Sequence, residues 1–192
     1  MGRKSKAEER LGETFVNQMG SVFFIKEYRR SDDVVVKFMD ENGVEVHTTW
    51  QNCVKQNVKN PYDKTVYGVA CIGEIGDFKT YVNGVPTREY NLWKNMIRRC
   101  YSGEEKFSTY ANVTVYERWL VFANFLEDLP FIENYQWWLE NENQYIALDK
   151  DLKQIGVENK VYSLETVKFV SASENIKEVH SRKGSTDEVE PF

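Results

Sequence analysis

The stretch that most constrains the fold begins at Tyr145 and reads YIALDKDLKQIGVENKVYSLETVKFVSASENIKE. Its first four residues predict a strand, and Val161-Tyr162 together with residues 166–170 predict a returning strand. Ser171 and Glu174 have the S-x-x-E spacing of a capping box, which marks the start of a short helix. The sequence therefore predicts a ββα unit near the C-terminal end of an α+β chain.

Oxygen-bearing side chains lie at both sides of this predicted unit. Asp149, Lys150 and Asp151 directly follow the first strand, and Asn175 lies in the helix. Carboxylate and amide oxygens are the ligands that Mg²⁺ takes in proteins. The pattern predicts a single Mg²⁺ held by Asp149, Asp151 and Asn175. The structural alternative is that the two aspartates cap the turn and Lys150 pairs with a carboxylate.

Residues 91–101 (NLWKNMIRRCY) predict an amphipathic helix. Its apolar residues recur at the i, i+3, i+4 and i+7 positions of one helix face: Trp93, Met96, Ile97 and Cys100. Lys94, Arg98 and Arg99 lie off that stripe and form the strongest local basic cluster. These side chains form either a solvated helix face or, with Lys4 and Lys6, a contact to nucleic acid.

Residues 116–128 (YERWLVFANFLED) predict a second amphipathic helix with its aromatic residues on one face. Core packing is the expected role of these aromatic residues. Asn83-Gly84 predicts a tight hairpin turn within residues 78–90.

The first part of the chain predicts a small β unit. Residues 22–25 and 33–39 are apolar runs, residues 44–50 alternate, and Asn42-Gly43 suits a hairpin turn between the last two. Short strands with tight turns suggest a five-stranded barrel that resembles the SH3 or Tudor type. Such barrels bind many kinds of partner, so the shape alone assigns no function.

The expected organisation has four segments. A flexible N-terminal tail covers residues 1–13, the β barrel residues 14–75, the α+β domain residues 76–180, and a flexible acidic tail residues 181–192. No apolar run approaches the roughly 20 residues that a membrane helix needs. The N-terminal residues lack the apolar stretch of a signal peptide. We expect a cytoplasmic protein with no membrane partner.

The distribution of charge and the number of cysteines limit the kinds of partner and metal site that the protein is expected to have. The net charge is −5, with residues 1–100 near +3 and residues 101–192 near −8. A chain that is acidic overall is no simple duplex binder, so contacts to nucleic acid are expected from local basic patches, and the acidic half suits a protein partner. The three cysteines are widely spaced and the chain has two histidines. We therefore expect reduced thiols and no zinc site.

Five motifs in a fixed order resemble phage proteins of the HNH endonuclease group, which includes homing endonucleases. In chain order they are W-x-x-M-x-x-R-C-Y at 93–101, W-x-x-F-x-x-F at 119–125, Leu148-Asp149-Lys150-Asp151, Y-S-x-E-x-x-x-F-V at 162–170, and Asn175. The match covers residues 90–178, nearly half of the chain. The resemblance implies a ββα-metal fold, a DNA substrate and one divalent metal that offsets charge on the attacked phosphate.

Two departures from the family pattern affect the implied chemistry. Lys150 occupies the place of the histidine that activates water, and an ordinary protonated lysine cannot accept a proton. Glu165-Thr166 stand where the family has a glutamate followed by the asparagine that braces the loop. Asp149 or Asp151 would then have to act as the base, or Lys150 itself with a strongly lowered pKa.

Three functions remain open on the sequence alone. The first is a Mg²⁺-dependent endonuclease with Asp149, Lys150 and Asp151 as catalytic residues. The second is a non-cutting relative that binds DNA or RNA through its basic residues. The third is a non-catalytic phage protein that binds a host polymerase, nuclease or defence factor through its acidic half.

Overall fold

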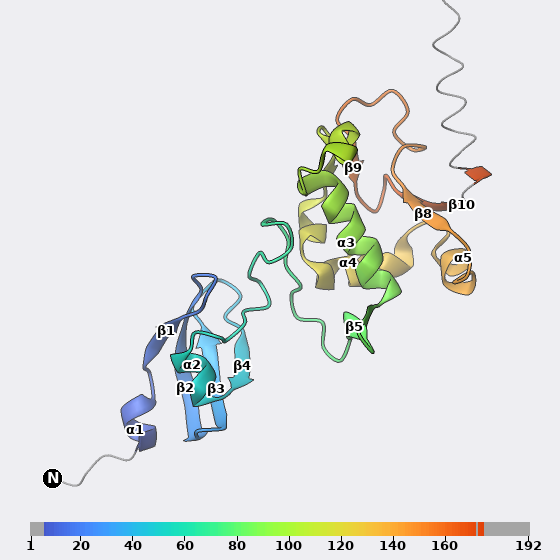
Figure 1. Ribbon diagram of the computed structural model, residues 1–192. Helices are drawn as coiled ribbons and strands as arrows, with labels where there is room; N and C mark the ends of the chain where they lie inside the picture. Colours follow the sequence, from blue (N-terminus) through green and yellow to red (C-terminus); the bar gives the residue numbers. More distant parts are fainter. Residues whose placement is uncertain (1–5, 172, 175–192) are drawn as a thin grey trace, which may run out of the picture. The chain divides into compact units, whose positions relative to one another are not determined.

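The computed structural model describes residues 6–171 and 173–174, which divide into two compact units (Figure 1). The N-terminal unit consists of the residues up to Thr65 together with Cys71–Glu74. The C-terminal unit consists of Val66–Ala70 and the residues from Ile75 onward. Helices and strands occur in both, so the chain has the mixed α+β content that the sequence predicts. The predicted site residues Lys4 and Asn175 and the predicted tail 181–192 lie outside the described residues.

An antiparallel four-stranded sheet forms the N-terminal unit. Across the sheet, its strands are β1 (Thr14–Val16), β2 (Val22–Arg30), β3 (Asp33–Phe38) and β4 (Glu45–Thr48). Their apolar residues pack with Cys53 of helix α2 (Trp50–Val54) into one core. Within the described residues, no ladder joins β4 to β1. Closure into a five-stranded barrel stays a prediction.

The Asn42-Gly43 turn between β3 and β4 forms as predicted. Asp40 Oδ1 accepts hydrogen bonds from the backbone N–H groups of Asn42 and Gly43, both at 3.0 Å. Gly43 has a φ of +57°, which glycine adopts without steric cost. The hydrogen bonds and the glycine together explain why this short sequence joins two paired strands.

Part of the segment expected to be a loose tail is ordered. Helix α1 (Lys6–Arg10) ends at Arg10, whose guanidinium carbon lies 3.7 Å from the ring centroid of Trp50 and 4.7 Å from that of Tyr28. The same guanidinium also donates a hydrogen bond to the Tyr28 hydroxyl. A cation on two aromatic faces gives this end of the tail a defined position, which its polar composition did not indicate.

The C-terminal unit combines short strand pairs with helices. The strand pairs are β5 (Tyr81–Val82) with β6 (Val85–Pro86), β7 (Thr114–Val115) with β9 (Val161–Tyr162), and β8 (Ile146–Asp149) with β10 (Lys168–Ser171). The first and third pairs are antiparallel and the second is parallel. The helices are α3 (Arg88–Tyr101), α4 (Phe122–Asp128) and α5 (Tyr135–Glu140), with 3-10 turns η1 (Glu105–Tyr110), η2 (Glu117–Leu120) and η3 (Leu129–Phe131).

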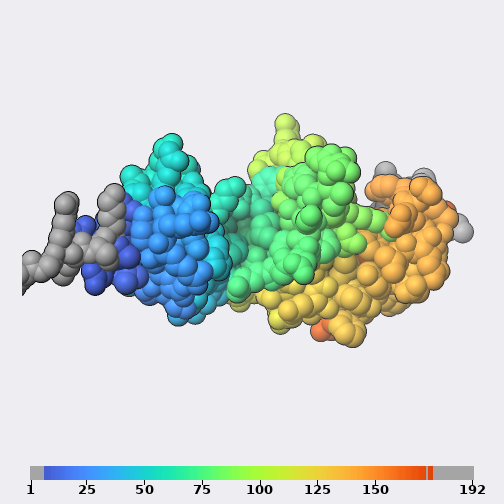
Figure 2. Space-filling model, turned by 90° about the horizontal axis from the view of Figure 1, so that it is seen from below, coloured from blue at the N-terminus to red at the C-terminus, as the bar shows by residue number. Residues whose placement is uncertain are grey.

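Helix α3 is the central element of this unit's core. Its predicted stripe is confirmed for Trp93, Met96 and Ile97, which are almost fully buried, whereas Cys100 is only partly buried. Trp93 Nε1 donates to the carbonyl oxygen of Trp119 at 2.7 Å, and its ring lies 5.1 Å from that of Phe122. In the space-filling view, the atoms of residues 85–165 form a continuous packed surface (Figure 2).

The single helix predicted for residues 116–128 is wrong, because the chain divides it in two. Val121 has an extended backbone (φ −100°, ψ 118°) between η2 and α4. Asp128 holds the two pieces together by accepting hydrogen bonds from Arg118 Nε at 3.0 Å and Trp119 Nε1 at 2.9 Å. The predicted burial of Trp119, Phe122 and Phe125 is nevertheless confirmed.

The C-terminal strands follow the predicted order with one correction. β8 pairs with β10, and Leu148 lies opposite Phe169. Val161-Tyr162 does not belong to the returning strand as predicted, because it pairs in parallel with β7. The capping box is confirmed: Ser171 N donates to Glu174 Oε2 at 2.9 Å, and Glu174 N donates to Ser171 Oγ at 3.2 Å. Over the described ranges, no helix is both long enough and apolar enough to cross a membrane.

Candidate functional site

Asp149 ends β8 and caps the turn that follows. Its Oδ1 accepts hydrogen bonds from the backbone N–H groups of Asp151 at 2.9 Å and Leu152 at 2.8 Å. The residue is only 6% exposed, and Lys168 lies opposite it in the β8–β10 register. A short acidic side chain that bonds to the backbone two residues on is a common way to fix a turn. The carboxylate is therefore engaged in holding the chain.

Lys150 is also directed into the protein and is 6% exposed. Its Nζ donates to both carboxylate oxygens of Asp151, at 3.0 and 2.9 Å, and lies 4.6 Å from the ring centroid of Tyr110. Lys160 Nζ donates to Asp151 Oδ1 at 2.6 Å. One carboxylate thus lies between two ammonium groups, an arrangement that we name the Lys–Asp–Lys cluster (Lys150, Asp151 and Lys160).

The cluster changes the acidity of Asp151. Burial by itself would raise the pKa of this carboxyl, but hydrogen bonds from Lys160 and Lys150 outweigh burial, and the pKa is lowered. Asp151 is therefore ionised at neutral pH and its charge is already balanced. A carboxylate held in this way is a poor general base, because a lowered pKa weakens its hold on a proton.

A buried glutamine that no motif indicated holds the loop between Lys150 and Val161. Gln154 Nε2 donates to the carbonyl oxygens of Lys150 at 2.7 Å and Val161 at 2.9 Å, while Gln154 Oε1 accepts from Val161 N at 2.9 Å. Thr166, at the position of the expected asparagine, donates its hydroxyl to the same Val161 oxygen at 2.7 Å. Gln154 and Thr166 thus brace this loop together.

The two predicted ligands that the structure describes, Asp149 and Asp151, do not fit a Mg²⁺ ion at this strand end, and the third, Asn175, lies outside the described residues. Asp149 Oδ1 is used by two backbone amides, and Asp151 receives two ammonium groups. A divalent cation would have to displace these cations to reach the carboxylate. In the part of the chain that the structure describes, no group of three or more His, Cys, Asp or Glu side chains is arranged to hold a metal.

The basic residues predicted to contact nucleic acid separate into different environments. Arg98 forms a paired contact with Glu104, with Nε to Oε1 at 2.6 Å and Nη2 to Oε2 at 2.9 Å. Lys94 Nζ lies 5.8 Å from the ring centroid of Tyr90. Arg99 lines a pocket on another side of α3. Lys6 begins helix α1. Arg98 is therefore held by a carboxylate within the fold, and Arg99 is bonded to the Tyr162 hydroxyl.

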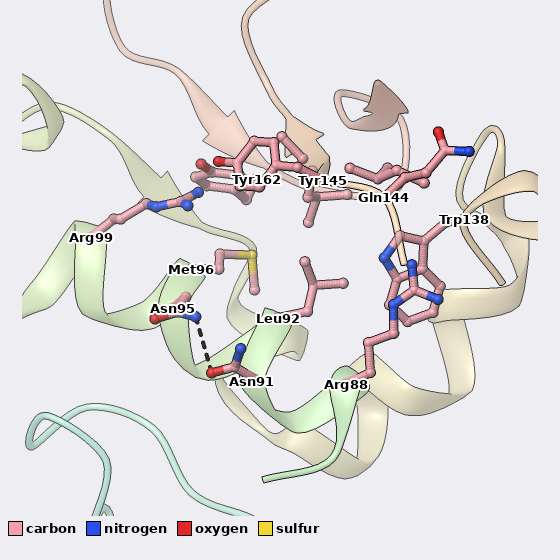
Figure 3. A pocket seen from close by; sticks show the side chains of 13 residues that line it. Arg88, Asn91, Leu92, Asn95, Met96, Arg99, Trp138, Gln144, Tyr145 and Tyr162 are labelled. Carbon is pink, nitrogen blue, oxygen red and sulfur yellow. Dashed lines mark hydrogen bonds between the residues drawn. The ribbon is translucent and has the colours of Figure 1, made fainter. Parts of the chain in front are cut away.

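The pocket beside Arg99 has a volume of about 230 Å³ and lies between one face of α3 and the start of β8 (Figure 3). Arg88 and Arg99 lie at its opposite ends in the view, and Leu92 and Met96 lie between them. Amide side chains of Asn91, Asn95 and Gln144 also line it. None of the 13 described residues that line this pocket is acidic, although the chain as a whole is.

Arg88 is a pocket residue that the sequence reasoning missed. Its guanidinium carbon lies 3.9 Å from the ring centroid of Trp138, which in turn stacks on Phe169 with ring centroids 5.0 Å apart. Nη1 of Arg88 is buried, and within the described residues it has no hydrogen-bond partner. The spacing of Arg88 and Arg99 on one helix was the available indication, but Arg88 lay outside the helix predicted to begin at residue 91.

Comparison of the chain with protein-family models, with curated proteins and with solved structures gave no significant match.

Proposed function

We propose that this chain is a non-cutting, phage-encoded relative of the HNH endonuclease group that binds the phosphate backbone of nucleic acid. In this proposal, the C-terminal unit retains the frame of the ββα module and the N-terminal unit is a barrel of the SH3 or Tudor type. The pocket that contains Arg88 and Arg99, with no acidic residue in its lining, is the observation that carries the proposal.

The arrangement at the end of β8 supports binding over cutting. A nuclease of this group needs a group that accepts a proton from water and a ligand set for a divalent metal. Asp149 caps a turn, and Asp151 is bonded by two lysines. These side chains stabilise the loop, so the Lys–Asp–Lys cluster is proposed to be structural.

Local charge supports phosphate as the ligand. A recessed site lined by one sign of charge concentrates ions of the opposite sign, even on a protein of opposite net charge. Arginine presents several N–H donors in a planar fork that suits phosphate oxygens. Arg88, Lys94 and Arg99 all lie on α3, and among residues 6–171 and 173–174 no hydrogen bond or ion pair joins them to a carboxylate.

The test measures the affinity for a fluorescein-labelled DNA strand by anisotropy between 50 and 200 mM salt. Three phosphate contacts predict that log K falls with log salt at a slope of about −2 for a single strand. Arg99→Ala should weaken binding and make this slope shallower. Arg30→Ala removes the same charge from an exposed arginine of the N-terminal unit and is the matched control. Equal affinities of the wild type and Arg99→Ala would contradict the proposal.

Cleavage is tested on the same DNA with Mg²⁺ or Mn²⁺. The proposal predicts intact DNA with the wild type and with Asp149→Ala. Cutting by the wild type that disappears in Asp149→Ala would mean that the strand end still performs chemistry, and it would remove the non-cutting part of the proposal.

A protein partner is the second candidate function. Ile155 is 75% exposed and Val157 is also exposed, and both lie on the loop between Asp151 and Lys160. A contiguous exposed apolar patch is typical of a contact to another protein, and these two side chains would form part of one. A host protein retained by the wild type but not by the Ile155→Asp, Val157→Asp variant would favour this candidate. Retention by both would count against it.

A further inference from the structure

We propose that the pocket between α3 and β8 holds one unpaired nucleotide, with its base between the two arginines and its phosphate on an arginine. This inference rests on the proposed binding of nucleic acid and specifies its form, namely a single strand or an unpaired position. It is drawn from the shape of the pocket, from its lining and from the buried Nη1 of Arg88.

The size of the pocket favours a single nucleotide over a duplex. Its volume of about 230 Å³ is below the roughly 300–1,000 Å³ of pockets that take drug-sized ligands, so it suits a single base with the sugar and phosphate at its rim. A duplex offers its phosphates on a convex surface and cannot place them inside such a pocket. A nucleotide that is not paired can turn its base out of the stack and insert it.

The lining matches the parts of a nucleotide. Leu92, Met96 and Leu148 give apolar contacts that suit the face of a base. Asn91 and Asn95 are linked by a hydrogen bond from Asn95 Nδ2 to Asn91 Oδ1 at 3.1 Å. Amide side chains carry a donor and an acceptor side by side, which is the pattern on the edge of a base.

The two arginines are placed to take phosphate groups at either end. They are eleven residues apart on α3, which corresponds to about 16 Å along the helix axis. The phosphate of one nucleotide therefore contacts one of the two arginines, and its base lies between them. Nη1 of Arg88 is buried and has no partner among the described residues. The Arg88 side chain would turn toward the pocket for a phosphate oxygen to supply this acceptor.

An exposed aromatic ring at the rim extends the site to a neighbouring base. Tyr145 lines the pocket and is 70% exposed, next to Gln144. An exposed tyrosine ring is a sequence-tolerant platform for base stacking. A single strand would therefore place one base in the pocket and the next on Tyr145.

The test compares a single strand that carries one 2-aminopurine with a blunt duplex of the same sequence. The inference predicts at least tenfold tighter binding of the single strand and a change in 2-aminopurine fluorescence when its base enters the pocket. The double variant Asn91→Ala, Asn95→Ala should lose that fluorescence change. Gln51→Ala removes an exposed amide from a helix of the N-terminal unit and should keep it. Tyr145→Ala should weaken binding of the single strand several-fold, and Tyr145→Phe should not.

Competition separates a nucleotide site from a simple anion site. A deoxynucleoside monophosphate should displace the strand at a concentration where inorganic phosphate does not. Equal competition by the two, or unchanged 2-aminopurine fluorescence with equal affinity for strand and duplex, would overturn the inference and leave phosphate-backbone binding in place. No binding of either DNA at 50 mM salt would overturn the proposed function as well.

Discussion

Replacement of Lys150 by methionine tests directly whether the end of β8 is structural. Lys150→Met keeps most of the packing volume and removes the ammonium group that bonds both oxygens of Asp151. Removing one partner of a buried ion pair lowers the free energy of unfolding by about 3–5 kcal/mol. Asp151 retains Lys160 at 2.6 Å, and 22% of its side chain is accessible. We therefore expect Lys150→Met to lower the free energy of unfolding by about 2–3 kcal/mol.

The assay is urea unfolding followed by tryptophan fluorescence, which reports mainly on the C-terminal unit because four of the five tryptophans lie there. With an m-value of about 2 kcal/mol/M, the midpoint should fall by about 1–1.5 M urea. The matched control is Lys153→Met, which removes the same group from a partly exposed pair with Glu133 and should cost less than about 1 kcal/mol. Equal midpoints for the two variants would refute the buried structural role of Lys150.

Three further predictions concern ionisable side chains elsewhere in the fold and at Asp151. The pKa of Asp151 is lowered because the lysine hydrogen bonds outweigh burial. The stability that the ionised Asp151 contributes is therefore complete above the unfolded-state pKa of about 3.9 and is lost as pH falls through the lower folded-state pKa. In urea midpoints measured against pH, Asp151→Asn should reduce this loss of stability at acidic pH. Hydrogen bonds from Arg98 and Lys106 lower the pKa of Glu104 to about 2, so the NMR chemical shift of its carboxyl carbon should stay constant down to about pH 3. Arg98→Ala should raise the pH at the midpoint of this titration. An unchanged midpoint would contradict the pairing. Burial raises the pKa of Cys53 and Cys100 to about 11, so neither thiol should react promptly with a disulfide reagent at pH 8 until urea is added.

Hydrophobic periodicity predicted the elements that bury a continuous face. The stripe of Trp93, Met96 and Ile97 defined α3, and the S-x-x-E spacing of Ser171 and Glu174 defined a cap whose reciprocal hydrogen bonds are present. Both patterns depend on contacts between residues that are close in the sequence, so the spacing of residue types is enough to predict them.

Contacts between distant residues account for the differences. The break at Val121 depends on Asp128 bonding back to Arg118 and Trp119, and the parallel pairing of Val161-Tyr162 depends on β7, more than 40 residues earlier. A prediction from local propensity uses only a short stretch of sequence, which includes neither of these distant partners. The tertiary contacts therefore decide the local structure.

The candidate site was predicted in part. Asp149, Lys150 and Asp151 do lie together at a strand end, and the structural alternative considered from the sequence, a turn cap and a lysine–carboxylate pair, is present. The second lysine, Lys160, comes from the far side of the loop and no spacing rule indicated it. The basic cluster of α3 was identified by composition, but only the fold separates Arg98, paired with Glu104, from Arg99 in the pocket.

The most direct measurement is one incubation of end-labelled single-stranded DNA with the protein and Mg²⁺, divided between a native gel that shows binding and a denaturing gel that shows cutting. Wild type and Arg99→Ala are compared under the same conditions. Retarded but intact DNA with the wild type, and a clear loss of retardation with Arg99→Ala, is the predicted result. Shortened DNA in the denaturing gel, or no retardation with the wild type at low salt, would contradict a non-cutting nucleic-acid binder.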